Sequence, residues 1–151
     1  MGNFYLSERI GDPVLMVAPV AHATDLVATD HAGVPIRDAQ GVLFILTAGV
    51  FAGDSATVAI TYASDGVASN ASASSDVWAS SNMTFTAVDS DSENSNFMLD
   101  LDLSNSGIDP NANGKFYCTG ENVGDPIYSL IGIPYNLNRS PATNAQTVLR
   151  R

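Results

Sequence analysis

Short runs of apolar residues, separated by turn-forming residues, recur along the chain and predict β-strands. The strongest stretch, Gly41–Tyr62, contains two such runs. Val42–Thr47 is almost unbroken in its apolar character, which is typical of a strand covered on both faces. Thr57–Tyr62 alternates instead, as a strand with one apolar face does. Because glycines and an aspartate lie between the two runs, we expect a hairpin on which the other strands pair or pack.

The clearest alternation lies in Phe97–Leu103, where Phe97 and every second residue after it should face inward and Met98, Asp100 and Asp102 outward. Other strand-like runs are Val14–Val20, Leu26–Thr29, Val34–Arg37, Met83–Val88, Lys115–Thr119 and Ile127–Ile133. In the first of them, Pro19 would be tolerated at a sheet edge or a bulge. About eight strands, with Gly, Asn and Asp between them, predict an all-β fold, either an antiparallel β-sandwich or a jelly-roll-like barrel.

The chain has 151 residues, which suits one domain that folds without a disulfide or a metal. We expect an extended N-terminal arm over residues 1–13, a β-sandwich domain over residues 14–135 and a C-terminal tail over residues 136–151. The Ser- and Asn-rich stretch Ser64–Ser81 should be a long exposed loop whose end is held by Trp78.

Charge and cysteine content exclude several classes of function and of stabilising bond. The net charge is −10, and the 6 Lys and Arg residues are too few to neutralise phosphates, so nucleic acid is not an expected partner. Three of them, Arg139, Arg150 and Arg151, make the tail basic against an acidic body. Cys118 is the single cysteine, which excludes an intramolecular disulfide and predicts a small buried strand residue. No apolar run approaches the ~20 residues of a membrane span, so we expect a soluble protein.

His22 and His31 lie in turn-like sequence without a Ser or Cys nucleophile motif. We therefore expect satisfied or solvated side chains, not a catalytic base or metal ligands. Asp109–Gly114 begins like a calcium loop, but Gly120 stands at the twelfth position, where an EF-hand requires glutamate. A polar turn is the simpler interpretation, and another kind of calcium turn stays open.

Acidic side chains offer two further candidates. Asp89, Asp91 and Glu93 could gather a hard cation, although acidic turns of this kind are usually solvated. Asp100 and Asp102 share a strand face about 6–7 Å apart, a spacing comparable to that of glycosidase carboxylates. Outward acids more often keep a strand edge soluble and unpaired. We therefore expect no catalytic residue, no cofactor and no metal.

The order of these segments resembles that of a group of small virion proteins of tailed bacteriophages. Their pattern runs from a D-x-x-G turn through an S-V-L-F-type strand and a strand ending in S-D-D-G. A Trp, an acidic stretch, an I-D-L-type strand and R-x-P follow. The counterparts here are Asp30–Gly33, Gly41–Ile45, Thr57–Gly66, Trp78, Phe85–Asp91, Leu99–Leu103, Phe116–Thr119 and Arg139 with Pro141. The chain departs from the pattern in its longer Ser64–Ser81 loop and in the Lys115–Cys118 strand.

The resemblance implies a minor capsid or decoration (cement) protein, made in the host cytoplasm, that binds the outside of the phage head and stabilises it. Its partners would be the major capsid protein and further copies of itself, for which a trimer would suit quasi-threefold sites. Two arms that become ordered on binding would serve as latches, at an entropic cost repaid by the contact. The residues expected to contact the capsid or another partner are Phe4, Tyr5, Arg9, Arg139, Arg150 and Arg151.

Two other functions stay open. A tail or head-fibre module would bind a host receptor or glycan, and it would need a cluster of aromatic residues or a metal on its surface. A small virion hydrolase would need a cleft that holds a positioned acid–base pair. The sequence marks neither feature, and we therefore favour a structural protein of the capsid exterior.

Overall fold

The computed structural model describes residues 10–51, 53–72, 84–88, 93–103, 108 and 113–135 of the chain. These residues form eight strands and two 3-10 helices, so the predicted all-β fold is confirmed. The strands are β1 (Val14–Ala21), β2 (Val34–Pro35), β3 (Gly41–Ala48), β4 (Ser55–Ala63), β5 (Thr84–Val88), β6 (Asn96–Asp102), β7 (Lys115–Val123) and β8 (Ile127–Tyr135). The 3-10 helices are η2 (Ala28–Asp30) and η3 (Ala68–Asn70).

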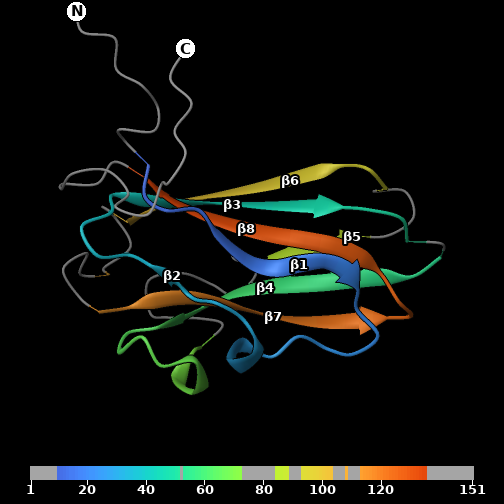
Figure 1. Cartoon of the computed structure of the whole chain (residues 1–151), viewed down its shortest axis with the longest axis horizontal. Helices are drawn as coiled ribbons and strands as arrows, with labels where there is room; N and C mark the ends of the chain where they lie inside the picture. Colours follow the sequence, from blue (N-terminus) through green and yellow to red (C-terminus); the bar gives the residue numbers. More distant parts are fainter. Residues whose placement is uncertain are drawn as a thin grey trace, which may run out of the picture.

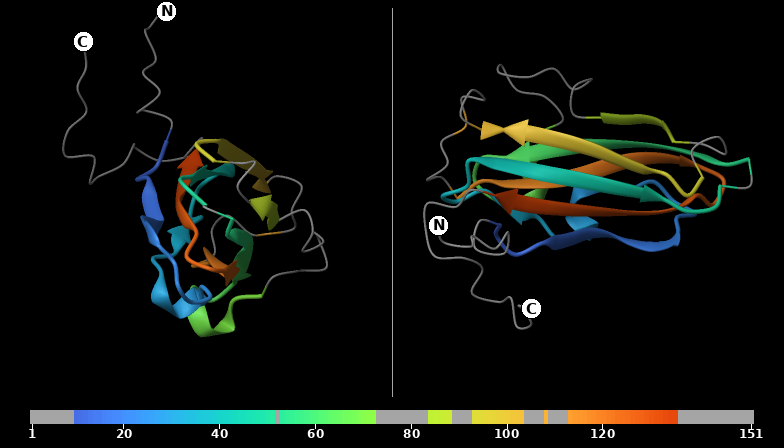
Figure 2. Two further views of the ribbon diagram at one scale, coloured as in Figure 1. Left: turned by 90° about the vertical axis from the view of Figure 1, so that its right-hand side faces the viewer. Right: turned by 90° about the horizontal axis from the view of Figure 1, so that it is seen from above.

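The strands divide into two four-stranded antiparallel sheets that face each other (Figures 1 and 2). Sheet A has the order β1-β8-β3-β6, and sheet B has the order β2-β7-β4-β5. The pairs are nested, because β1 pairs with β8, β2 with β7, β3 with β6 and β4 with β5. Pairing of β3 with β8 and of β4 with β7 joins these nested pairs into sheets. A long hairpin rolled up in this way is a jelly roll, one of the two predicted alternatives.

The hydrophobic core lies between the two sheets. Phe44 of β3 meets Phe116 of β7 edge to face, with the ring centroids 5.5 Å apart and the rings at 86°. Aromatic pairs favour this arrangement, so the contact ties sheet A to sheet B. Cys118 of β7 is a free, buried cysteine, as predicted.

The predicted hairpin at Gly41–Tyr62 is wrong. Its two strands, β3 and β4, lie in different sheets: β3 pairs with β6 and β8, and β4 pairs with β5 and β7. Phe51, in the connection between them, is fully buried, and its backbone N–H donates to the Glu93 carboxylate at 2.9 Å. A connection with a buried aromatic side chain crosses from one sheet to the other, whereas hairpin loops are usually short and polar. Both strands are apolar because both contribute to the core, from opposite sides.

β1 lies at an edge of sheet A, and its register against β8 shifts twice, once between Val17 and Val20. Pro19 falls within that shift, so the prediction of an edge or bulge position for this proline is confirmed.

The two ends of the described part of the chain lie side by side. Ile10 forms a β-bridge with Tyr135, and the Gly11 N–H donates to the Pro134 carbonyl at 2.6 Å. Residues 1–9 and 136–151, which hold most of the predicted arms, lie outside the described residues, as does Trp78.

Candidate functional site

The outer face of sheet A carries an apolar row that crosses all four strands. The register aligns Leu15 of β1 with Ile131 of β8, Ile131 with Ile45 of β3, and Ile45 with Met98 of β6. Directly opposed residues in antiparallel strands point to the same face, so the four side chains form a continuous strip. The two ends of the strip are open to solvent, since Leu15 is 52% and Met98 71% exposed. Ile45 and Ile131 are half-buried. We call these four residues the apolar row.

An acidic margin, Asp100 and Asp102, lies next to the apolar row on the same face. The register places Asp100 beside Leu43, which in turn opposes Ile133, and it places Asp102 beside Gly41, which opposes Tyr135. Both carboxylates are exposed. The outward direction predicted for Met98, Asp100 and Asp102 is therefore confirmed, and the face combines an apolar strip with negative charge.

Tyr135 closes this end of the face. Its hydroxyl donates to Asp100 Oδ1 at 2.7 Å, and to reach that carboxylate the ring passes over Gly41, where a Cβ atom would collide with it. Burial raises the pKa of Tyr135 to about 12, and the hydrogen bond to Asp100 and the charges of Asp100 and Asp102 act in the same direction. At neutral pH the phenol is therefore protonated and able to donate.

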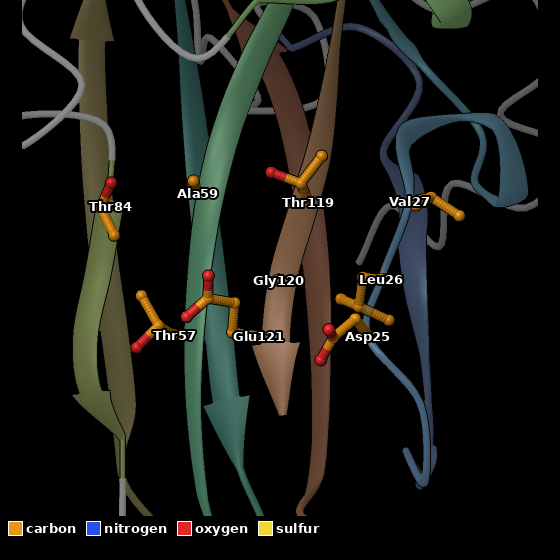
Figure 3. Close-up of a pocket in the computed structure, with 9 residues that line it drawn as sticks. All are labelled: Asp25, Leu26, Val27, Thr57, Ala59, Thr84, Thr119, Gly120 and Glu121. Carbon is orange, nitrogen blue, oxygen red and sulfur yellow. The ribbon is translucent and has the colours of Figure 1, made fainter. Parts of the chain in front are cut away.

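Sheet B presents a different outer face, with a depression of ≈480 Å³ (Figure 3). Its polar lining comes from three threonine hydroxyls and two carboxylates, on β5, β4, β7 and the segment that precedes η2. The residues that supply these groups are Thr57, Thr84, Thr119, Asp25 and Glu121. The rest of the lining comes from Leu26, Val27, Ala59 and Gly120, so the depression mixes hydroxyl and carboxylate groups with apolar side chains.

One of the two carboxylates in the depression has a structural role. Leu26 and Gly120 exchange backbone hydrogen bonds of 2.8 and 3.1 Å, which attach the segment before η2 to β7. The Asn122 N–H donates to Asp25 Oδ1 at 2.9 Å, and the Asn122 side-chain amide donates to the Thr24 carbonyl at 2.7 Å. Asp25 therefore holds this segment in place, which leaves Glu121 as the other carboxylate of the depression.

The two histidines have different surroundings. The His22 ring packs against Tyr128 with the centroids 4.6 Å apart, and its Nε2 lies 3.1 Å from the Ala18 carbonyl oxygen, so the expectation of a satisfied side chain holds. His31 departs from that expectation, because its Nε2 is buried and has no hydrogen-bond partner within the described part of the chain. Burial lowers the pKa of His31, and the charge of Asp30 opposes that shift.

Several predicted site residues belong to parts of the chain that the structure does not describe. The expected contact residues Phe4, Tyr5, Arg9, Arg139, Arg150 and Arg151 lie outside the described residues, as do Asp89, Asp91 and Asp109. In the ranges that the structure describes, no group of three or more His, Cys, Asp or Glu residues could hold a metal ion. No helix in those ranges has the length and apolar character needed to cross a membrane.

The apolar row was not predicted as a site. Its signal was present in the sequence, because Val42–Thr47 is apolar at successive positions and Ile127–Ile133 is apolar at most of them. Such an unbroken run is typical of a strand covered on both faces. In the structure, Phe44 and Leu46 are fully buried on the inner face, whereas Leu43 and Ile45 are half-buried on the outer face. The extra apolar residues therefore belong to a surface.

Comparison with known proteins leaves the family open. No family model matches the chain, and no curated protein matches it either. Among solved structures, the chain is similar to one from "Structure of deformed wing virus, a honeybee pathogen", with 10% sequence identity and a TM-score of 0.41. That match covers 99% of this chain and 58% of the other, so this chain spans little more than half the other's length. A function for this chain is therefore proposed from the surfaces of its two sheets.

Proposed function

We propose that the protein is a virion structural protein, a decoration (cement) protein that binds the outer surface of a tailed-phage head and stabilises it. The observation that carries this proposal is the apolar row on the outer face of sheet A. Single exposed apolar residues are ordinary, but an apolar strip that continues across four strands marks an interaction surface. The neighbour that covers it would be another virion subunit, either the coat protein or a second copy of this chain.

The side chains on the two outer faces also suit binding to another protein subunit better than they suit catalysis. A jelly roll by itself does not specify a function, so the choice depends on what its faces present. The depression on sheet B contains two carboxylates, Asp25 and Glu121, but Asp25 accepts the Asn122 N–H and holds the chain in place. An acid–base pair would require both carboxylates to be available to a substrate.

The depression supports one alternative function. Its threonine hydroxyls and carboxylates could hydrogen-bond a sugar, which would suit a tail or head-fibre module that binds a host glycan. Its described lining contains no aromatic ring. A glycan array with the purified protein tests this alternative, and substitution of Glu121 by Gln should then abolish any binding found.

Binding to heads tests the proposed function. We expect Leu15→Glu and Met98→Glu to weaken binding to heads stripped of their decoration protein by at least tenfold, because each places a charge in the apolar row. Both side chains are more than half exposed, so neither change should prevent folding. Val123→Glu is the matched control, since Val123 is 65% exposed and belongs to sheet B. Co-sedimentation measures the affinity, and equal binding by all three variants would contradict the proposal.

Electron microscopy of intact particles provides a direct check of location. We expect density for the jelly roll on the outer surface of the head. Density on the tail would favour the alternative function, and density inside the shell would exclude both.

A further inference from the structure

Positive charge is scarce in the described part of the chain and concentrated in the C-terminal tail. Arg37 and Lys115 are the only Lys or Arg residues among the described ones, where Asp and Glu outnumber them several-fold. Residues 136–151 contain Arg139, Arg150 and Arg151 and no Asp or Glu. The tail also contains apolar residues, with Val148 and Leu149 directly before the last two arginines. It therefore has both the charge and the apolar character that complement the outer face of sheet A.

The tail begins next to that face. Tyr135, the last residue of β8, opposes Gly41 and donates to Asp100, so residue 136 follows directly at the acidic margin. Arg139 comes four residues after Tyr135 in the sequence. The tail's 16 residues could span up to ~50 Å if extended, which is longer than the strands of sheet A. Length therefore does not limit the tail to the molecule from which it starts.

We propose that the C-terminal tail of one copy docks on the outer face of sheet A of a second copy. The tail's arginines pair with Asp100 and Asp102, and its aliphatic residues cover the apolar row. This proposal deepens the proposed function, on which it rests only in taking this face as the interaction surface, and it names a second copy of the chain as the occupant. The decoration protein would then reach the head as a preformed assembly.

The direction of β8 favours a second copy over the tail's own face. Gly41 and Tyr135 form the last register pair between β3 and β8, so a chain that continues along β8 moves off the end of sheet A. Covering its own face would require the tail to turn back over the sheet after leaving Tyr135. A neighbouring copy at that end of the sheet can receive the tail without a reversal.

Charge also argues against two copies meeting sheet to sheet. A symmetric contact in which the same ends of the two sheets meet would bring the acidic margins of both copies together, and like charges removed from water repel strongly. A tail-to-face contact instead pairs opposite charges. It is heterologous, so it closes into a ring if the rotation between copies permits, and a trimer is one such ring.

Mixing two complementary variants of the full-length chain tests the proposal. The face variant, Asp100→Asn with Asp102→Asn, keeps a working tail, and the tail variant, Arg139→Ala with Arg150→Ala and Arg151→Ala, keeps a working face. We expect each variant alone to self-associate at least tenfold more weakly than the wild type in sedimentation velocity at low salt. An equimolar mixture should recover a 1:1 complex, because the tail of the first variant meets the face of the second.

Three controls sharpen this experiment. The matched charge control is Asp30→Asn with Glu121→Gln, which removes two exposed acidic residues outside sheet A and should associate like the wild type. A synthetic peptide of residues 136–151 should dissociate the wild-type assembly, whereas a scrambled peptide of the same composition should not. Raising the NaCl concentration to about 0.5 M should weaken the association, since salt screens exposed charge pairs.

Several results would overturn the proposal. These are a monomeric wild type at all concentrations, self-association of either variant at wild-type strength, and failure of the mixture to form a complex. Because the assay contains no heads, its failure is distinct from failure of the proposed function. A chain that assembles as expected but does not bind heads would keep this inference and lose the decoration role.

Discussion

The Tyr135 ring lies across Gly41, and its hydroxyl donates to Asp100 Oδ1 at 2.7 Å. One side chain from β8 thereby crosses β3 and contacts β6. Cross-strand contacts of this kind contribute about 0.2–1 kcal/mol per pair, but this one also fixes the position of a carboxylate in the acidic margin. Three adjacent strands of sheet A are therefore tied together where the C-terminal tail begins.

Gly41→Ala should destabilise the protein by about 1–3 kcal/mol, because the new Cβ atom would collide with the Tyr135 ring. Urea unfolding followed by circular dichroism measures the change. The double variant Gly41→Ala with Tyr135→Ala should lose less stability than the sum of the two single changes, since removing the ring removes the collision. Additive losses would show that the two residues do not interact in this way.

Stability should fall as the pH rises from about 10 towards 12, in part because of Tyr135. Its pKa in the folded protein is raised to about 12, above the ordinary value of 10. A group whose folded pKa is raised contributes stability that is fully present below its unfolded pKa and is lost as the pH passes through the folded value. Tyr135→Phe should lose less stability than the wild type between pH 10 and pH 12. Parallel pH profiles would contradict this assignment.

His31 should make the protein sensitive to mild acid. Burial lowers its pKa below 6.5 in the folded state, so the unfolded chain binds a proton more readily. The resulting stability is present above about pH 6.5 and is lost as the pH falls through the lower, folded pKa. Urea midpoints between pH 7.5 and pH 5 should decline less steeply for His31→Gln than for the wild type. An unchanged slope would indicate that the ring is already solvated.

Cys118 should resist thiol reagents in the native protein. Its side chain is fully buried, and burial raises its pKa to about 12, so very little reactive thiolate is present at pH 8. We expect labelling by a chromogenic disulfide reagent only at the rate of unfolding, and rapid labelling in denaturant. Thr119→Cys, placed on the half-buried position next to it, should react faster in the native state. Prompt native labelling of Cys118 itself would contradict its burial.

Local patterns in the sequence were sufficient to predict the fold class and the alternation of β6. Phe97, Leu99 and Leu101 are half-buried whereas Met98 and Asp100 are exposed. This alternation could be predicted because successive side chains of a strand point to opposite faces of the sheet. The pairing of strands was a different matter. β3 and β4 follow each other in the sequence, but β3 pairs with β6 and β8, whereas β4 pairs with β5 and β7. No local sequence pattern specifies partners that lie so far along the chain.

The apolar row could not be predicted for a related reason. The sequence shows that position 45 is apolar, but it does not show whether another part of the protein covers that side chain. Only the register shows that Leu15, Ile131, Ile45 and Met98 align across four strands. Likewise, the need for glycine at position 41 comes from a tyrosine ninety-four residues later in the chain.

The position of β8 in the centre of sheet A has a consequence for biosynthesis. β8 pairs with β1 on one side and β3 on the other, although it is the last of the described strands to leave the ribosome. Until it emerges, β1 has no partner in the sheet, and the first half of the nascent chain exposes unpaired strand edges. We therefore infer that sheet A cannot be completed until β8 has been synthesised, since closing such distant pairs is slow and the unpaired edges attract other chains meanwhile. A message truncated before Ile127 should accordingly yield aggregates in place of a smaller soluble domain.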